Sequence, residues 1–221
     1  MKVGTAEEAL SEAKPGRPVM LVDETASSLK TLKPEVLVDA IMAKRNCGTK
    51  CGMAPLVIAL GPGFTAGRDA DFVIETKRGH RLGRIISDGC AAPNTGIPGM
   101  IEGHGADRVI HAPEGGCLRV FCGIGSVVRK GDLVAEVVSA DGIKVPVFAS
   151  LSGVIRGMLP DGFGVTAGMK MADIDPRLSE LENCRTVSDK ARCIAGGVLT
   201  LISAYEHHCL DLFRNAEERR E

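Results

Sequence analysis

The sequence predicts a mixed α+β fold, with a partial α/β unit at the N-terminus, a β-rich middle and a C-terminal helix. Three observations predict it. Most of the 27 glycines lie between Gly48 and Gly168, where they alternate with runs of Val, Ile and Leu that are typical of short strands joined by turns. Aromatic residues make up only 3% of the chain, so the core must be aliphatic. The glycine-poor ends carry helical patterns.

Residues 1–50 are expected to form a partial Rossmann-like α/β segment. Thr5 and Glu8 make a capping box, which predicts a short helix that ends near Ala13. Strand and helix candidates then alternate, as in α/β proteins. They are a buried strand at Pro18–Asp23, a helical turn at Ser27–Leu32 and a strand at Val36–Met42.

Residues 51–106 are expected to form a β region with glycine-rich loops. The strand candidates are Leu56–Leu60, Phe72–Thr76 and Leu82–Ser87. A long loop, Asp88–Gly105, follows them. Ordered loops of this length often carry function, so this region is the first place to search for a site.

Residues 107–176 contain an internal repeat. A shift of 37 residues places Ala112 on Ala149, and it superposes five further pairs that are glycines of expected turns or aliphatic residues of expected strands. Neither half could bury its apolar face alone, so the halves should pack as a pseudo-twofold sandwich. The repeat therefore predicts one domain made of two similar β units.

The repeated phrases Ala112–Gly116 and Ala149–Gly153 resemble the lipoyl and biotinyl carrier domains, and this likeness implies a barrel-sandwich hybrid. A carrier domain needs a lysine in the hairpin that joins its halves. Ala140–Gly142 occupies that turn, with Lys144 beyond it, and the biotin-like triplet around Lys170 stands in the wrong place. Neither lipoate nor biotin is expected.

Residues 177–221 are expected to form a C-terminal helical segment. Ser188 is a candidate N-cap, and apolar residues recur at helical spacing from Ile194 to Leu212. Gly196 and Gly197 each weaken a helix, which predicts that the helix packs closely against a neighbour. The helix either docks onto its own domain or makes a dimer contact, so a homodimer is one alternative.

Composition excludes several classes of protein. The formal net charge of −1 and the lack of aromatic stacking platforms argue against nucleic-acid binding. No uncharged stretch reaches the roughly 20 residues of a membrane span, and the N-terminus lacks the apolar core of a signal peptide, so a cytoplasmic protein is expected. The eight cysteines show no paired zinc spacing, so most are expected to be small apolar thiols and no metal site is predicted.

Gly61, Gly63 and Gly67 lie in a loop that follows the strand Leu56–Leu60 and superficially resembles a dinucleotide fingerprint. The fingerprint requires a helix next, but a strand candidate follows within a few residues. The Rossmann signal is therefore weak. The alternative is a loop whose backbone N–H groups form an anion nest.

A basic segment, Lys77–Arg84, supports an anion site. It contains Arg78, Arg81 and His80 and no acidic residue. Arginine can bind an oxyanion through two parallel hydrogen bonds. The segment is either part of a site or a solvated basic hairpin, and a position next to the loop at Gly61 would favour the site.

Cys90 is the candidate nucleophile. Its thiol lies in a glycine-rich loop that follows the basic segment, where nearby cations could stabilise a thiolate. His80 or His104 would be the base. The same loop continues through Asn94, Thr95 and Gly96, which join the glycines and arginines as candidate ligand-binding residues. The alternative is that Cys90 is a small packed residue.

Three motifs in order carry a resemblance to one family. They are Ala54–Phe64, Glu75–Arg84 and Pro93–Gly99, and the likeness continues through the repeat to Asp173–Arg177 and Val187–Arg192. The sequence resembles the accessory proteins of the selenium-dependent molybdenum hydroxylase system, often called the YqeB family. Members usually begin with a Rossmann-like half with a glycine-rich first turn, which this chain lacks.

The resemblance implies a maturation factor that helps install the selenium ligand at the molybdenum cofactor. The expected partners are a molybdenum hydroxylase apoenzyme and a small anionic ligand, either a selenium species or the phosphate of the cofactor. The chain is then either a truncated or split member, or a member that has lost its nucleotide-type site. Two rival functions remain: a non-catalytic docking module for the hydroxylase, and a nucleotide-dependent enzyme.

Overall fold

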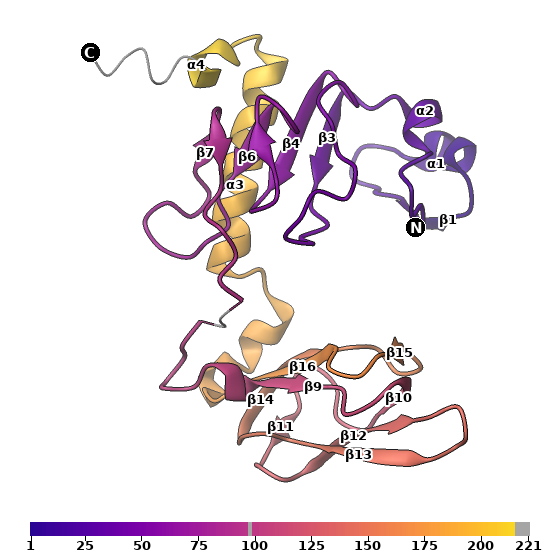
Figure 1. The fold of residues 1–221 in the computed structure, drawn as a ribbon. Helices are drawn as coiled ribbons and strands as arrows, with labels where there is room; N and C mark the ends of the chain where they lie inside the picture. Colours follow the sequence, from indigo (N-terminus) through magenta and orange to yellow (C-terminus); the bar gives the residue numbers. More distant parts are fainter. Residues whose placement is uncertain (97–98, 215–221) are drawn as a thin grey trace. The chain divides into compact units, whose positions relative to one another are not determined.

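The computed structural model describes residues 1–96 and 99–214, which form two compact units (Figure 1). Unit 1 comprises Met1–Asn94 and the chain from Asp189 onward, and unit 2 comprises Thr95–Ser188. Several small sheets and a long C-terminal helix, α3 (Asp189–Glu206), confirm the predicted mixed α and β architecture. The C-terminal helix belongs to unit 1, because its apolar face packs on the sheet of that unit.

The N-terminal region is a small αβ segment. Helix α1 (Ala6–Glu12) begins as predicted, with the Thr5 hydroxyl accepting a hydrogen bond from the Glu8 N–H at 3.1 Å. The buried strand expected at Pro18–Asp23 is wrong: only Met20–Leu21 forms a strand (β2), paired in parallel with β1 (Lys2–Val3). Since this pair joins no larger sheet, the strand is only partly covered: Leu21 is half-buried, and Met20 is 59% exposed.

Unit 1 is built on a sheet in the order β3-β4-β6-β7. Strands β3 (Val36–Asp39), β4 (Leu56–Leu60) and β6 (Phe72–Ile74) are parallel, and β7 (Ile85–Ile86) is antiparallel to β6. Helix α2 (Leu29–Leu32) precedes β3. The third predicted strand is shorter than expected, because Leu82 donates to the Gly79 carbonyl in a turn. No helix connects β4 to β6, in agreement with the weak Rossmann signal.

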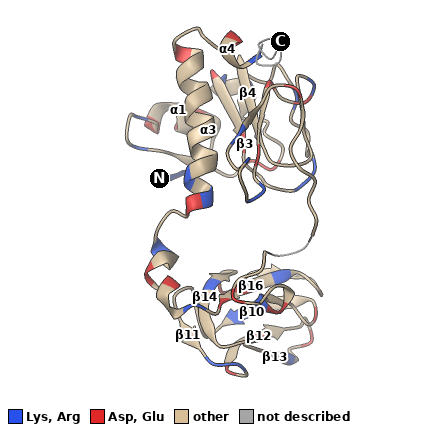
Figure 2. Cartoon of the chain, turned by 90° about the vertical axis from the view of Figure 1, so that its left-hand side faces the viewer, with Lys and Arg blue, Asp and Glu red and all other residues tan. Residues whose placement is uncertain are grey.

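The two faces of this sheet are covered differently. On one face, Leu56, Ile58, Phe72 and Ile74 pack against α3 through Leu201, and α3 runs along the sheet in Figure 2. A short helix, α4 (Asp211–Arg214), follows it. The opposite face is covered by loops that carry β5 (Thr65–Ala66) and β8 (Gly89–Cys90) rather than by a helix. The loops that carry the candidate site are therefore fixed directly on the sheet.

One of the two helix glycines makes a close contact. A Cβ atom at Gly197 would lie 2.6 Å from the carbonyl oxygen of Gly83 and 3.2 Å from Ile74 Cδ1. Gly196 has no neighbour within 4 Å of its Cβ position. Close packing is thus confirmed at Gly197 and wrong at Gly196. The helix docks onto the sheet of its own unit.

We predict opposite effects for the two glycines. Gly196→Ala should stabilise unit 1 by up to about 1 kcal/mol, because alanine favours the helix and meets nothing. Gly197→Ala should destabilise it by about 1–2 kcal/mol, because overpacking against backbone costs more than the helix gains. Urea unfolding of both variants measures the difference. Equal changes of unfolding free energy in the two variants would contradict the close contact between Gly197 and Gly83.

Unit 2 consists of two four-stranded antiparallel sheets around one core. One sheet has the order β13-β12-β10-β15 and the other β11-β14-β16-β9. Short 3-10 turns, Ala106–Arg108, Leu178–Glu180 and Glu182–Arg185, flank them. The strands are β9 (Val109–His111), β10 (Gly116–Val120), β11 (Val127–Val128), β12 (Leu133–Val138), β13 (Lys144–Phe148), β14 (Gly153–Met158), β15 (Gly164–Val165) and β16 (Lys170–Asp175).

The predicted repeat is confirmed by the strands. The shift of 37 residues that aligns the sequence carries the start of β10 onto β14, of β11 onto β15 and of β12 onto β16. Each half gives its first and third strands, β9 and β11 or β13 and β15, to the sheet that contains the second and fourth strands of the other half, and the strand orders of the two sheets correspond. The halves are therefore interlocked and related by a pseudo-twofold.

Two glycines of the repeat have a different role from the expected turns. Gly116 and Gly153 begin strands β10 and β14. A Cβ at Gly116 would collide with the carbonyl oxygen of Val138, and one at Gly153 with that of Asp175, at equivalent positions of the two halves. Glycine is required at both positions because two backbones meet there.

Among the described residues, no helix is long and apolar enough to cross a membrane.

Candidate functional site

Glu75 organises the loops of the candidate site. It follows β6 directly and is only 5% exposed. Its two carboxylate oxygens accept the N–H groups of Lys77 and Ala92, each at 2.7 Å. Its backbone also bonds to Gly83 and Arg84, both at 2.9 Å. One buried carboxylate thus ties the basic segment to the segment that follows Cys90.

Sequence reasoning missed Glu75. The signal that could have found it is an acidic residue placed directly after a buried strand, at the carboxyl end of a parallel sheet, where ligand sites gather in open α/β folds. A buried carboxylate must be hydrogen-bonded, and here the partners are backbone groups of two different loops.

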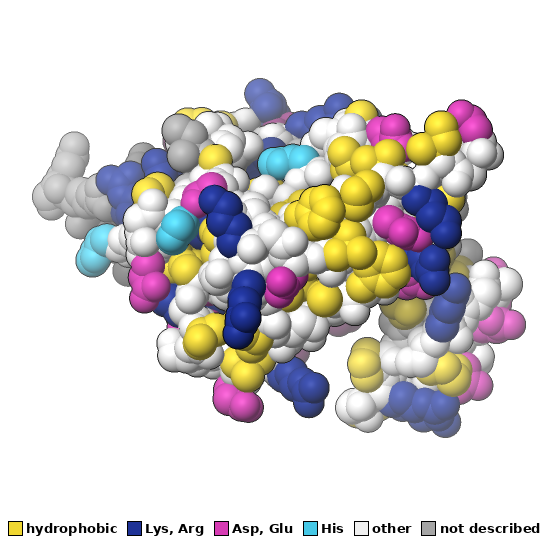
Figure 3. Space-filling view, turned by 90° about the horizontal axis from the view of Figure 1, so that it is seen from below, with side chains coloured by type: hydrophobic (Ala, Val, Ile, Leu, Met, Phe, Trp, Pro, Cys, Tyr) yellow, Lys and Arg dark blue, Asp and Glu magenta, His cyan; other side chains and the backbone are white. Residues whose placement is uncertain are grey.

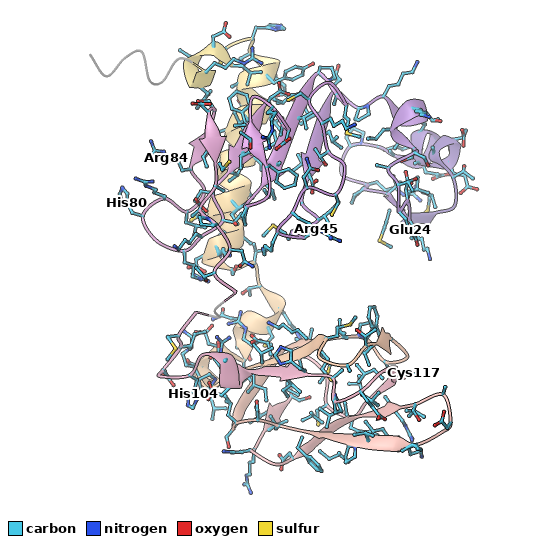
Figure 4. All side chains as sticks on the ribbon, in the orientation of Figure 1. Glu24, Arg45, His80, Arg84, His104 and Cys117 are labelled. Atoms are coloured by element: carbon cyan, nitrogen blue, oxygen red, sulfur yellow. The ribbon has the colours of Figure 1, made fainter. Side chains whose placement is uncertain are left out.

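A pocket of about 860 Å³ lies between these loops. It is lined by the basic segment, by β7 and by the segment from Ser87 to Pro93. Four predicted residues line it together: Cys90, His80, Arg78 and Arg81. Figure 4 labels His80 and Arg84 on the side of unit 1 where this loop projects. The structure therefore brings the candidate nucleophile and the basic segment into one cavity.

The cations of the pocket are not equivalent. Arg78 is already paired with Asp189 at the start of α3, at 2.6 and 3.0 Å, and this pairing lowers the pKa of Asp189 to about 2. The ion pairs among residues 1–96 and 99–214 involve neither Arg81 nor Arg84. Arg81 and Arg84 therefore supply the positive charge that a bound anion would meet.

Lys190 lies in the same electrostatic environment as Arg78. Its pKa is lowered, first by burial and then by the positive charges of Lys44 and Arg78, while Glu75 acts in the opposite direction. Positive charge is therefore concentrated at the N-terminus of α3. Asp189 compensates part of it through its ion pair with Arg78.

Cys90 lies on strand β8, directly opposite Thr65 of β5. Its Sγ is 3.3 Å from the Thr65 hydroxyl, and the side chain is exposed. The pKa of Arg68 is raised chiefly by its partner Asp69, and the negative charge of a Cys90 thiolate adds to this. The thiol is thus accessible from the pocket and close to a cation outside the basic segment.

The two candidate bases occupy different units. His80 lines the pocket with Cys90, but the hydrogen bonds of the described part of the chain include none between these side chains. His104 belongs to unit 2, where its Nδ1 is hydrogen-bonded to Asp107. The role of His80 as the base stays a prediction.

The structure does not bring the glycine loop into the pocket. Gly61, Gly63 and Gly67 are absent from its lining. The N–H of Gly61 donates to the Ile74 carbonyl at 2.9 Å, that of Gly67 to the Ala70 carbonyl at 2.8 Å, and that of Thr65 to Asp69 at 2.8 Å. These N–H groups are satisfied inside the protein, so they form no open anion nest.

Packing explains two of these glycines. A Cβ at Gly61 would lie 2.6 Å from the Thr76 hydroxyl, and one at Gly63 would lie 2.6 Å from the Arg45 Cα. Arg45 is labelled in Figure 4 beside the end of the sheet. The loop reaches the site only through Thr65, which contacts Cys90.

The remaining predicted residues lie where the units divide. Asn94 is the last residue of this stretch in unit 1, and Thr95 and Gly96 fall in unit 2. In this segment Pro93 is the last residue that lines the pocket, and Phe213 of α4 lines it from the C-terminal part of the chain. Ile97 and Pro98 of the third sequence motif lie outside the described residues. Within residues 1–96 and 99–214, no group of three or more His, Cys, Asp or Glu side chains could hold a metal ion.

Comparisons with known proteins give one sequence relative. No family model matches the chain. The chain is 48% identical over 200 residues to the uncharacterized protein YqeB of Escherichia coli K12, which covers 90% of this chain and 36% of that protein.

Solved structures give distant likenesses. The product-bound ectoine utilization protein EutE (DoeB) of Ruegeria pomeroyi is 24% identical, over 31% of this chain and 21% of that chain, with a TM-score of 0.29. A succinylglutamate desuccinylase/aspartoacylase of Rhodobacter sphaeroides is 21% identical, over 33% and 23%, also with a TM-score of 0.29. The chain is therefore similar in sequence to YqeB over most of its own length, in agreement with the resemblance of its motifs, and it spans about a third of the length of YqeB.

Proposed function

We propose that the chain is an accessory factor for maturation of selenium-dependent molybdenum hydroxylases, and that it binds an oxyanionic selenium species or cofactor phosphate in the pocket beside Cys90. The observation that carries this proposal is the cavity of about 860 Å³ in which Arg81, Arg84 and His80 face the same space as the Cys90 thiol. The biological setting comes from the resemblance of the sequence motifs to the accessory proteins of this system, and the 48% identity to YqeB agrees with the YqeB part of that resemblance.

The chemistry of the lining suits an oxyanion. Guanidinium groups bind oxyanions through charge-assisted hydrogen bonds, and Arg81 and Arg84 have no ion-pair partner within the described residues that would compete. The cavity falls within the roughly 300–1,000 Å³ typical of ligand pockets, which exceeds the needs of a single small anion. It therefore has room for a phosphate that carries a larger group, such as a pterin.

Phosphate protection of Cys90 from alkylation tests the site. Inorganic phosphate serves as an inert oxyanion, and iodoacetamide, which is uncharged, reports thiol accessibility by peptide mass spectrometry. Phosphate should slow the labelling of Cys90 several-fold and leave Cys117, an exposed thiol of unit 2, unchanged. Arg81→Ala should abolish this protection, because it removes a cation with no competing partner among the described residues.

Arg129→Ala is the matched control, since it removes the same charge from a turn of unit 2. It should leave the protection of Cys90 intact. Equal phosphate effects on Cys90 and Cys117, or protection that survives Arg81→Ala, would refute the anion site.

A second candidate function is a non-catalytic docking module for the hydroxylase. The observation that favours it is the exposure of large apolar side chains on unit 2, such as Phe121 and Phe148. Incubation with selenite distinguishes the two candidates by intact mass. Condensation of a thiol with hydrogen selenite releases water and leaves a thiol-bound selenium(IV) group. An adduct that Cys90→Ser removes favours the first function, and hydroxylase binding without such an adduct favours the second.

We also propose that residues 107–176 form a barrel-sandwich hybrid without a prosthetic group. The interlocked repeat supports this proposal. Lys144 is the first residue of β13 and lies 3.9 Å from Glu136, and Lys170 is the first residue of β16 and lies 3.8 Å from Asp173. Neither occupies the tip of the hairpin between β12 and β13. Lipoate or biotin on either lysine, detected by mass spectrometry of the native protein, would contradict the proposal.

A further inference from the structure

The aromatic residues of unit 2 lie outside its hydrophobic core. The chain has six Phe, one Tyr and no Trp, and in unit 1 Phe64 and Phe72 are buried. The core cluster of unit 2 contains only aliphatic residues and methionine. Its phenylalanines are exposed instead: Phe121 by 45%, Phe148 by 52% and Phe163 by 41%. Folding of unit 2 therefore does not explain why these rings are present.

Phe121, Leu133 and Phe148 form a row across three neighbouring strands, which we call the β10–β12–β13 row. Leu133 and Phe148 are direct register partners. Phe121 directly follows β10, and its N–H donates to the carbonyl of Val134 at 3.0 Å, so its backbone lies opposite the residue that follows Leu133. All three side chains are at least 44% exposed. The space-filling view shows hydrophobic side chains gathered on the surface, with Lys and Arg side chains beside them (Figure 3).

The next row across the same strands carries charge. Arg119, Glu136 and Pro146 are register neighbours. Glu136 alone serves two cations, since its Oε1 lies 3.1 Å from Arg119 Nη1 and 3.9 Å from Lys144 Nζ. The Arg119 guanidinium also lies 5.5 Å from the centre of the Phe121 ring. The face therefore combines apolar anchors with an excess of positive charge.

The β13 edge of this sheet, which borders the row, is blocked against strand addition. The edge strand β13 contains Pro146, which lacks an N–H, and begins with Lys144. Proline and lysine on edge strands are the usual protection against pairing with another strand. A partner that contacts the row would therefore dock on the face of the sheet and not along the β13 edge. Aromatic anchors next to an arginine are typical of the energetic centre of protein interfaces.

We propose that the β10–β12–β13 row, with Arg119 and Lys144, is a docking surface for a segment of another protein that presents apolar side chains flanked by carboxylates. The apolar side chains would cover Phe121, Leu133 and Phe148. Glu136 offers one negative charge to the two cations Arg119 and Lys144, so a carboxylate of the partner would neutralise the remaining positive charge. This surface does not rest on the anion pocket, so failure of the phosphate experiment leaves it untouched.

Fluorescence anisotropy of the full chain with labelled synthetic peptides tests the surface. The probe is an amphipathic peptide with Leu and Phe on one face and Glu on the other, and the comparison peptide carries Lys in place of Glu. The acidic peptide should bind at least tenfold more tightly than the basic one. Leu133→Ser and Phe148→Ser should each weaken its binding by about tenfold, as expected for interface anchors.

Leu178→Ser is the matched control. Leu178 is 60% exposed and belongs to the same unit, but it lies in the turn that packs against β14 of the other sheet. This variant should bind the acidic peptide as the original chain does. Circular dichroism checks that each variant is folded, and the two separate anchors give independent readings. Equal binding of both peptides, or equal loss in Leu178→Ser, would overturn the proposal. A dimer in sedimentation that Leu133→Ser dissociates would also overturn it, because the occupant would then be a second copy.

Discussion

Replacing Asp175 by Asn should lower the free energy of unfolding of unit 2 by about 3–5 kcal/mol, the usual cost of breaking a buried ion pair from one side. Asp175 is 1% exposed. One carboxylate oxygen accepts the N–H of Arg177 at 3.0 Å and its Nε at 2.9 Å, and the other accepts Nη2 of Arg177 at 2.7 Å and Nη1 of Arg156 at 3.4 Å. The NH₂ group of Asn would face a guanidinium there, and the single amide oxygen could accept only part of these hydrogen bonds.

The ion pairs around Asp175 make the loss larger than for an isolated pair. Glu180 bridges the same two arginines, at 3.1 Å from Arg156 and 3.4 Å from Arg177. Removal of Asp175 leaves two guanidinium groups with a single carboxylate. In the motif Asp173–Arg177, which carries part of the family resemblance, Asp175 and Arg177 thus have a structural role in this network.

The same carboxylate predicts the acid sensitivity of unit 2. Its hydrogen bonds with Arg177, and to a smaller degree with Arg156, lower the pKa of Asp175 from 3.8 to about 2. Because the folded pKa lies below the unfolded value, the stabilisation is complete above about pH 4 and is lost as the pH falls toward 2. The loss amounts to about 2 kcal/mol.

Denaturant unfolding at pH 6, 4 and 2.5 measures this loss. The Asp175→Asn variant should lose less stability over this range than the original chain. Asp141→Asn is the control, since Asp141 lies in the exposed turn between β12 and β13, and it should change stability by no more than about 0.5 kcal/mol. A variant at Asp175 that unfolds like the control would show that the network does not stabilise the unit.

The repeat of unit 2 could be predicted because its information is local and duplicated. Each half carries the same order of glycines and aliphatic residues, so a fixed shift of 37 residues aligns strands that the structure then shows as equivalent. The strand at Pro18–Asp23 could not be predicted in the same way. Its apolar residues correctly predict a strand at Met20–Leu21. Whether that strand is buried depends on neighbouring elements, which only the tertiary structure shows.

The candidate site was predictable in part, for a similar reason. Cys90, His80 and Arg81 are close in sequence, and the β6–β7 hairpin with the strand β8 that follows it brings them to the same pocket. Glu75 was missed because its role depends on two backbone N–H groups, one of them 17 residues away at Ala92. The packing role of Gly63 could not be predicted, because the backbone of Arg45, which requires a glycine there, approaches from a different loop.

Gly83→Ala should destabilise unit 1 by about 3 kcal/mol, for two separate reasons. Gly83 has φ +78°, a conformation that costs an L-residue roughly 1–2 kcal/mol. A Cβ there would also collide with the backbone carbonyl of Cys193 in α3, and overpacking adds about 1–3 kcal/mol. The carbonyl belongs to a helix packed on the sheet, so it cannot move without shifting the helix.

Gly67→Ala separates the two reasons. Gly67 also has φ +78°, but nothing lies within 4 Å of its Cβ position. Gly67→Ala should lose only the stability that corresponds to the cost of a positive φ for alanine. The difference in unfolding free energy between the two variants therefore measures the collision with the helix. Urea unfolding of both variants gives this difference, and equal losses would contradict the collision.

The same contact links the stability of unit 1 to its pocket. Gly83 bonds to the Glu75 carbonyl at 2.9 Å, at the base of the segment that carries Arg81. A helix displaced by Gly83→Ala would therefore move this segment, and phosphate should lose its protection of Cys90 in this variant while Gly67→Ala retains it. Because Gly83 and Gly197 meet in one contact, the losses from Gly83→Ala and Gly197→Ala should not add in the double variant. If the losses of unfolding free energy were additive, the helix and the basic segment would move independently. The hydrogen bonds of Glu75, and not the contact with the helix, would then hold the basic segment in place.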